Sequence, residues 1–380
     1  MSKKKKIRAD FRKNRSDRAR STNWTRQFDS DELSVDNTLR GERLSGKGDL
    51  SRRRTIISED IPSEGENPPG RQLSVDETLC RPGRVLSVHG LFSEVQAADG
   101  VIYHCVTRRI LKTLTTDLRH VVTAGDRVLF RPADKTGSNE GFIERVEPRR
   151  GMLCRQVRRR QQILVTHVDL VAIVSSAAEP RLKPNLIDRM LVATEKGDIR
   201  PVICINKIDL VDVADLQPLV GVYSQMGYEV LLLSAKTGFG VERLRRLLIG
   251  RSSVLAGQSG VGKSSLLNRV DPSLHLHVQP VSLDTEKGKH TTSNARLMPL
   301  TDGGYVVDTP GIRHFQLWDV VPEEIDGYFR DLRPYISLCR FPNCTHTHED
   351  DCAVKNAVAD DRLDERRYES YCHLRAGEME

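Results

Sequence analysis

The sequence has no long apolar segment, and cysteine and aromatic residues are sparse. None of the apolar runs in its 380 residues approaches the ~20 residues that a membrane-spanning helix needs. The Lys/Arg-rich start is not followed by the apolar stretch of a signal peptide. Eight cysteines are too few and too irregularly spaced for a disulfide scaffold. These absences predict a soluble, cytoplasmic protein with no membrane partner.

Positive charge is concentrated at the N-terminus. The formal net charge is +7, but residues 1–26 hold eleven Lys and Arg residues against Asp10 and Asp17, so the remaining chain is close to neutral. A cationic tail suits a nucleic-acid backbone, because each contact can release a condensed counterion. A solvated extension with no fixed partner is the alternative.

Composition divides the chain into an extension and three further units. Residues 1–80 are rich in Ser, Arg, Asp, Gly and Pro and predict a disordered basic extension, because they bury too little apolar surface to offset the entropy of ordering. Within it, LSVDNTL at 33–39 recurs as LSVDETL at 73–79, either as a docking motif or as a simple duplication. Residues 81–155 hold five short β-type runs and many Arg residues, which favours an OB-fold barrel that either binds RNA or serves as a charged spacer.

Residues 160–315 alternate apolar β-type runs with helical periods, which predicts an α/β domain with a mainly parallel sheet covered on both faces. Residues 316–380 are polar and helical and form the last unit. The strands are expected at 168–175, 202–205, 230–233, 254–256 and 305–307, and the helices at 185–196, 213–226, 241–248 and 263–270.

A phosphate-binding loop opens the last of these helices. The run Gly257, Gln258, Ser259, Gly260, Val261, Gly262, Lys263, Ser264 fits G-x-x-x-x-G-K-[ST] and lies between a predicted strand and a predicted helix, as the mechanism requires. Its glycines let backbone N–H groups converge on phosphates, and Ser265 continues the loop into the helix. We expect Lys263 to reach the outer phosphates and the Ser264 hydroxyl to bind Mg²⁺.

Two further motifs select guanine over adenine. Asn206, Lys207 and Asp209 form an N-K-x-D motif after an apolar strand, and the Asp209 carboxylate can accept from both N1–H and the exocyclic amine of guanine. Ser234, Ala235 and Lys236 follow the next strand, where a small residue lets its backbone N–H approach guanine O6. The bound nucleotides are therefore predicted to be GTP and GDP.

The parts expected to sense the γ-phosphate follow the phosphate loop. Asp308 would hold Mg²⁺ through water, and the Gly311 N–H would contact the γ-phosphate. Thr291 or Thr292 could complete the Mg²⁺ shell while the γ-phosphate is present, and adjacency does not separate the two.

The order of these motifs is circularly permuted. Ras-like GTPases begin with the phosphate loop, whereas here N-K-x-D and S-A-K precede it. With the leading barrel and the trailing Cys/His cluster, the chain resembles the ribosome small-subunit-dependent GTPase A family over about residues 82–375, including Ile187-Asp188-Arg189 and the run 288–292. His167 departs from the Asn usual in the family, and Lys289 from a frequent Arg; neither belongs to a nucleotide motif.

The resemblance implies a GTPase that binds the small ribosomal subunit and its rRNA, assists late assembly and leaves after hydrolysis; we expect a monomer. Two alternatives are a GTP sensor with little hydrolysis and a zinc-dependent nucleic-acid binder that acts away from the ribosome. Ile312 suggests the first, because it stands where Ras-like enzymes place the water-orienting Gln. The resemblance makes His290 the candidate replacement, with Thr291, Thr292 and Lys263 completing the catalytic set; an inert loop histidine is the other interpretation of His290.

The C-terminal unit contains a potential zinc site. Cys339, Cys344, His346 and Cys352 supply three thiolates and one imidazole, the ligands of a closed structural site for one Zn²⁺. His348 competes with His346, which the resemblance favours, and unbound reduced cysteines are the alternative. Because this unit follows Gly311 in the chain, we expect it to respond to loss of the γ-phosphate.

Overall fold

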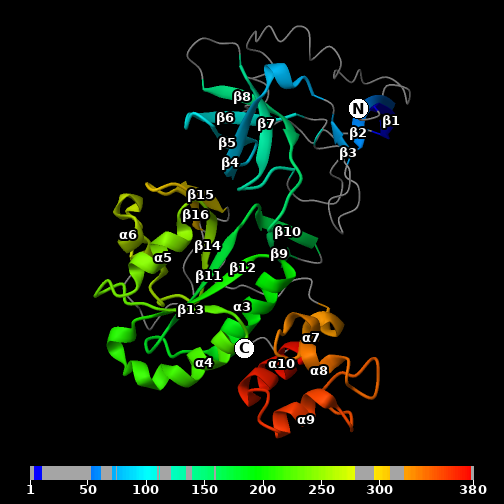
Figure 1. Cartoon of the computed structure of the whole chain (residues 1–380). Coiled ribbons are helices and arrows are strands. Elements are labelled where there is room, and N and C mark those ends of the chain that lie inside the picture. Colours follow the sequence, from blue (N-terminus) through cyan, green and yellow to red (C-terminus); the bar gives the residue numbers. More distant parts are fainter. Residues whose placement is uncertain are drawn as a thin grey trace, which may run out of the picture.

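The computed structural model describes residues 4–10, 53–60, 71–73, 75–108, 111, 121–133, 139–157, 160–278, 295–308 and 321–377. A β-barrel lies next to an α/β domain, and a small helical unit packs against the other side of that domain (Figure 1). No helix within these residues is long and apolar enough to cross a membrane. The expected architecture is observed: an α/β domain with a mainly parallel sheet lies between a closed five-stranded, OB-like barrel and a C-terminal helical unit with a Cys/His cluster.

The barrel is closed by five strands in the order β4-β5-β6-β8-β7. Valines and aromatic residues on alternate strand positions fill its interior, including Val85, Val95 and Phe130, each with no more than 1% of its surface exposed. The parallel pair β6–β8 closes the barrel, whereas its other pairs are antiparallel. The strands are β4 (Arg81–His89), β5 (Phe92–Ala97), β6 (Ile102–Thr107), β7 (Arg127–Pro132) and β8 (Glu140–Val146).

Three short strands lie within the predicted N-terminal extension, residues 1–80. Strands β1 (Lys4–Asp10), β2 (Arg53–Asp60) and β3 (Arg71–Leu73) form an antiparallel sheet in which Lys4 lies opposite Glu59 and Asp10 opposite Arg53. Strands β1 and β2 are about 50 residues apart in the chain, and their pairing satisfies the hydrogen-bonding groups of both backbones. Such pairing needs no periodic pattern of apolar residues, so no local signal for it is present in the sequence. Asp76 caps the short 3₁₀-helix η3 (Glu77–Leu79) of the second LSVD repeat, whereas the first repeat lies outside the described residues.

A hairpin that the sequence reading did not anticipate links the barrel to the α/β domain. It consists of β9 (Leu153–Val157) and β10 (Arg160–Val165), which pair antiparallel. Leu153 and Val165 are each 1% exposed and pack in the core of the α/β domain. The strands are short and lack a clear alternation, which explains why composition alone left them unassigned.

The α/β domain contains a six-stranded sheet in the order β13-β12-β11-β14-β16-β15, parallel except for β15. Side chains of β11 alternate between two cores: Val171 and Ile173 face one, and Ala172 and Val174 face the other. The strands are β11 (Leu170–Ser176), β12 (Arg200–Asn206), β13 (Glu229–Leu232), β14 (Ser252–Ala256), β15 (Arg296–Pro299) and β16 (Tyr305–Asp308). Sequence periodicity missed only β15, whose four residues are too few to show a period.

Helices cover both faces of this sheet. Apolar residues of α3 and α4 pack in the first core, and those of α5 and α6 pack in the second. The helix expected at 213–226 is instead divided into η5 (Val213–Leu216) and α4 (Gln217–Gln225), because Asp212 caps a short first turn and Pro218 begins a new helix. The bounds are α3 (Pro184–Lys196), η4 (Ile208–Leu210), α5 (Val241–Leu248), α6 (Lys263–Val270) and η6 (Pro272–Leu274).

The C-terminal unit packs on α3. Arg367 of α10 is 3% exposed and donates to Asp188 of α3 at 2.6 Å and to Asp331 at 2.9 Å. Its guanidinium also lies 4.5 Å from the ring centroid of Phe329. A second contact joins Arg330 to Glu195, near the end of α3. The elements are η7 (Pro322–Glu324), α7 (Ile325–Tyr328), α8 (Arg333–Ile336), α9 (Ala353–Ala359) and α10 (Glu365–Ala376).

Candidate nucleotide and metal sites

The three described nucleotide motifs lie at the carboxyl ends of the strands, on one side of the sheet. N-K-x-D follows β12, S-A-K follows β13 and the phosphate loop follows β14. These strands are parallel and lie close together in the sheet, so their carboxyl ends meet at the edge where open α/β sheets bind ligands. Asp308 ends β16 at the same edge. Motifs from four separate strands therefore converge in space.

The phosphate loop adopts a conformation that only its glycines permit. Gly257 has φ 151°, and a Cβ there would lie 2.1 Å from the carbonyl oxygen of Val174. Gly262 has φ 92°, and a Cβ there would lie 2.4 Å from Nδ2 of Asn206. The backbone thus passes too close to its neighbours for any side chain at either position.

Lysine and serine side chains of the loop lie at the start of α6. Lys263 begins the helix and donates through Nζ to the carbonyl oxygens of Gly257 at 2.7 Å and Gln258 at 2.6 Å. These two hydrogen bonds hold the ammonium group of Lys263 against the loop that the motif predicts to bind phosphate. Val261 is buried, Ser259 is exposed, and Gly260, Ser264 and Ser265 are half-buried.

Asn206 joins the three loops. It is 1% exposed; its Nδ2 donates to the carbonyl oxygen of Val261 at 2.8 Å, and its Oδ1 accepts from the backbone N–H of Ala235 at 3.1 Å. One side chain therefore fixes the phosphate loop and the S-A-K loop relative to the N-K-x-D loop. The N-K-x-D pattern assigns Asn206 to the guanine-selecting motif, but the sequence alone did not indicate these partners.

Asp209 is exposed and oriented by the S-A-K loop. Ser234 donates to its Oδ1 at 2.6 Å, and this hydrogen bond holds the pKa of Asp209 below its usual value. The carboxylate is therefore ionised at neutral pH and can accept from a ligand. Lys207 has φ 62° and donates through Nζ to the carbonyl oxygen of Glu179, in the loop after β11, whereas Lys236 is exposed.

The predicted γ-phosphate contacts fall largely outside the described residues. His290, Thr291, Thr292, Gly311 and Ile312 all lie there, and of Asp308 only the backbone is described. These residues form two segments, one at 290–292 and one that begins at Asp308. The hairpin β15–β16 between the two segments is described, with Arg296 opposite Asp308.

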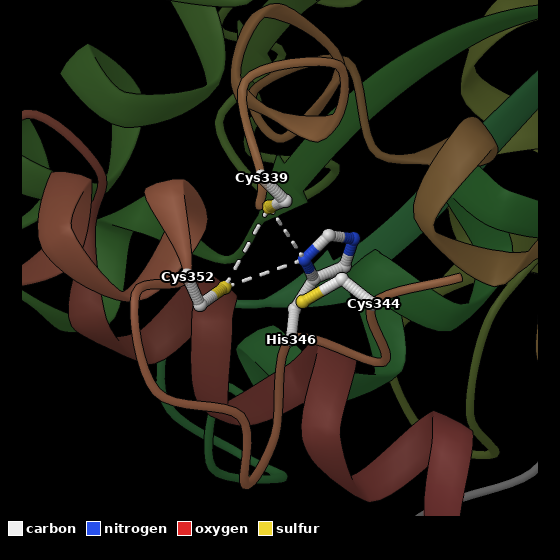
Figure 2. Close-up of side chains that lie close together, drawn as sticks. All are labelled: Cys339, Cys344, His346 and Cys352. Atoms are coloured by element: carbon white, nitrogen blue, oxygen red, sulfur yellow. Dashed lines mark hydrogen bonds between the residues drawn. The ribbon is translucent and has the colours of Figure 1, made fainter. Parts of the chain in front are cut away.

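The four metal-ligand candidates come together in the C-terminal unit (Figure 2). One donor atom from each of Cys339, Cys344, His346 and Cys352 lies within 4.8 Å of the others. His346 Nδ1 is 3.4 Å from Sγ of both Cys339 and Cys352, and these two sulfur atoms are 3.9 Å apart. Three thiols and an imidazole at this separation fit one zinc ion in a closed tetrahedral site.

The surroundings of the cluster distinguish between the two histidines. His346 is 1% exposed, and its Nε2 lies 3.4 Å from Oδ2 of Asp326, which can orient the ring so that Nδ1 faces the sulfur atoms. The His348 side chain is 80% exposed and contacts Glu349 instead. The structure thus places His346 in the cluster and His348 outside it. Asp326 was missed from sequence, since it lies 20 residues away and belongs to no motif.

Two tyrosines of α10 fix the loop that carries His346. Tyr368 donates to the carbonyl oxygen of His346 at 2.8 Å, and Tyr371 donates to that of Thr345 at 2.6 Å. Glu349 accepts from the backbone N–H groups of Thr345 at 2.6 Å and Thr347 at 3.1 Å. The cluster is therefore supported from both the helix and the loop.

Comparison with known proteins agrees with this geometry. A profile of the RsgA GTPase family matches residues 146–318. The small ribosomal subunit biogenesis GTPase RsgA of Sodalis glossinidius is 39% identical over 299 residues, which cover 77% of this chain and 84% of that protein. Its namesake from Yersinia enterocolitica is 40% identical over 302 residues, covering 77% and 83%.

Solved structures give the same result. YjeQ from Thermotoga maritima superposes with a TM-score of 0.66 at 36% identity, covering 79% of this chain and 99% of that one. YloQ, a circularly permuted GTPase, gives 0.61 at 30% identity, covering 79% and 95%. These matches confirm the resemblance inferred from motif order and favour a GTPase over both alternatives. The chain belongs to the RsgA family of circularly permuted GTPases.

Proposed function

We propose that this protein hydrolyses GTP on the small ribosomal subunit, where it assists late assembly and is released after hydrolysis. The observation that carries the proposal is the Asn206 side chain, which links the guanine-selecting loops to the phosphate loop at one sheet edge. The partner is inferred from family membership, because the relatives from Sodalis glossinidius and Yersinia enterocolitica are named for biogenesis of that subunit.

The roles of the nucleotide-binding residues follow from their chemistry. Asp209 accepts from the guanine edge, the stem of Lys207 lies over the ring, and the loop Ser234–Lys236 offers backbone N–H groups to O6. Lys263 leaves the carbonyl oxygens of Gly257 and Gln258 and reaches the outer phosphates. The backbone of residues 257–265 supplies the remaining donors at the start of α6.

Hydrolysis needs a metal ion and a positioned water. Mg²⁺ would be held by Ser264, by Thr291 or Thr292, and by Asp308 through water, and it would neutralise charge on the phosphates. Ile312 cannot hydrogen-bond to water, so we assign water positioning to His290. Replacement of His290 by Ala should lower turnover on small subunits while GTP affinity stays constant; unchanged turnover would remove His290 from the mechanism.

Zinc would have a structural role. Cys339, Cys344, His346 and Cys352 fit one Zn²⁺ and leave no ligand position open, so the ion would stabilise the C-terminal unit. The proposal retains the division into an extension at 1–80, a barrel at 81–155, a GTPase domain at 160–315 and a zinc unit at 316–380. Barrel and zinc unit would both contact rRNA, with the protein acting as a cytoplasmic monomer.

The decisive experiment is GTP turnover with and without purified small subunits. We expect a clear increase in multiple-turnover phosphate release with small subunits and none with large subunits at equal concentration. Equal rates in all three conditions would contradict the proposed function. Co-sedimentation with subunits over a salt series checks the rRNA contact, because binding carried by phosphate contacts weakens as salt rises.

A further inference from the structure

The barrel packs against the hairpin β15–β16, at the edge strand of the sheet. Strand β4 contacts β15, and Figure 1 shows the barrel next to this end of the domain. The C-terminal unit, in contrast, makes its described contacts with the domain mainly along α3. The two flanking units therefore touch different parts of the GTPase domain.

A β-bulge in β4 places one residue of the barrel, Leu86, in the hydrophobic core of the α/β domain. The pairing of β4 with β5 shifts between Val85 and Ser87, so Leu86 has no direct partner. Val85 packs inside the barrel, whereas Leu86, 2% exposed, packs in the same core cluster as Ala295 and Leu297. A bulge commonly redirects a side chain in this way. Leu86, from the barrel, therefore belongs to the same core as the residues that begin the hairpin, and its strand β4 contacts β15.

Polar contacts surround this apolar connection. The Tyr305 hydroxyl of β16 donates to Oε1 of Gln96 in β5 at 2.8 Å, and the guanidinium of Arg84 lies 4.7 Å from the centroid of the Tyr305 ring. Arg296 of β15 lies 3.7 Å from Glu94, which shares the outer face of β5 with Gln96 because side chains alternate along a strand. Both strands of the hairpin are therefore held by β5.

The same hairpin connects the two segments assigned to the γ-phosphate. Arg296 lies four residues after Thr292, and Tyr305 lies three residues before Asp308. Its two strands are short and are paired along their whole length, from Arg296 opposite Asp308 to Pro299 opposite Tyr305. A change at either segment would therefore act on a short paired element that contacts the barrel through Tyr305 and Arg296.

We propose that Tyr305 and Gln96, with Leu86, form a joint that couples the nucleotide state to the barrel. The proposal rests on the proposed function for the meaning of the γ-phosphate segments. Binding of the small subunit to the barrel favours the conformation of the hairpin in which the nucleotide site hydrolyses GTP. Because such coupling is reciprocal, the barrel binds the subunit with different affinities when the protein holds GTP and when it holds GDP. Tyr305 and Gln96 are positioning residues, since they belong to no nucleotide motif and their hydrogen bond joins β16 to β5.

The test is Tyr305→Phe and Gln96→Leu, each of which removes the hydrogen bond and keeps a side chain of similar size. A neutral hydrogen bond corresponds to about a fivefold change in an equilibrium constant. At saturating small subunits we expect kcat to fall about two- to tenfold, with basal turnover and GTP affinity unchanged. The ratio of subunit affinities with a non-hydrolysable GTP analogue and with GDP should fall by a similar factor.

Tyr228→Phe is the matched control, because it removes a tyrosine hydrogen bond, to Glu195 at 3.2 Å, at the opposite edge of the same sheet. An equal loss in the control would show that the effect is unspecific and overturn the joint. Unchanged stimulation in Tyr305→Phe, or basal turnover reduced by the same factor as stimulated turnover, would also overturn it.

A measurement without ribosomes separates this inference from the proposed function. If wild-type turnover does not rise with small subunits, the proposed function fails, but the joint can still be judged by hydrogen exchange. We expect amides of residues 84–97 to exchange at different rates with the GTP analogue and with GDP in the wild type, and at equal rates in Tyr305→Phe. Equal rates in the wild type would refute the coupling.

Discussion

His167 should make the folded protein sensitive to mild acid. It is 4% exposed, has φ 53°, and neither ring nitrogen has a hydrogen-bond partner within the described residues. Burial lowers its pKa to about 4, and the charges of Arg127, Arg84 and Arg150 act in the same direction, against the opposing charge of Asp126. The neutral imidazole is therefore the form that the fold accommodates.

The sign of the effect follows from proton linkage. The unfolded chain binds a proton at His167 near pH 6.5, whereas the folded protein does so only near pH 4. Stability is thus full above pH 6.5 and decreases as the pH falls toward 4, with a loss of about 2 kcal/mol between pH 7 and pH 5. For a folded unit of 150–250 residues this corresponds to a decrease of roughly 4–8 °C in Tm.

The assay compares wild type and His167→Asn in thermal and urea unfolding at pH 7, 6 and 5. Asn tolerates the left-handed backbone conformation and does not titrate, and the family resemblance points to Asn at this position. The other histidines are common to both proteins, so the difference between the two pH profiles isolates His167. We expect the variant to lose about 2 kcal/mol less than wild type on acidification. Parallel profiles would refute the assignment of a depressed pKa.

Three further predictions concern the nucleotide site, the metal site and the packing of the C-terminal unit. Asn206→Ala should weaken GTP binding by about tenfold or more, whereas Asn268→Ala, which removes two bonds to Leu276 of 2.8 Å each, should leave affinity unchanged in equilibrium titrations. Cys352→Ser should reduce the zinc content and the Tm, and Cys80→Ser should change neither; equal zinc in both by elemental analysis would contradict the assigned ligands. Arg367→Met should cost about 3–5 kcal/mol in urea unfolding because it leaves Asp188 buried without its charged partner. Arg366→Met, at an exposed pair with Asp364, should cost under about 1 kcal/mol, and similar losses in both variants would argue against a special role for the buried pair.

Much of the nucleotide site could be predicted from sequence because its motifs are local. Gly257, Gly262 and Lys263 are close in the chain, and the conformation that brings them together is limited by the positive φ angles that glycine permits. Asp209 and Ser234 were predicted to share the guanine site, and a 2.6 Å hydrogen bond now joins them. Because parallel strands bring their carboxyl ends together, the position of each motif after a predicted strand was enough to place the motifs together.

Other features depend on contacts between distant segments. The strands of the N-terminal extension and the hairpin β9–β10 have weak local patterns, and their pairing with other strands decides their structure. Arg367 looks like an ordinary helical arginine in the sequence, yet it is buried between Asp188 and Asp331. Tertiary packing overrides local composition at these positions.

The sequence by itself determined the family, the permuted motif order, the guanine-selecting residues and the composition of the metal cluster, because each depends on residue types at short spacing. Only the tertiary structure decided that His346 rather than His348 faces the three cysteines, since this depends on Asp326, Tyr368 and Tyr371 from other segments. It also decided that the barrel meets the hairpin through Leu86 and Tyr305. From chain order we expected only the zinc unit, which follows Gly311, to respond to loss of the γ-phosphate. Connectivity shows which units are neighbours in the chain, but it does not show which surfaces pack together.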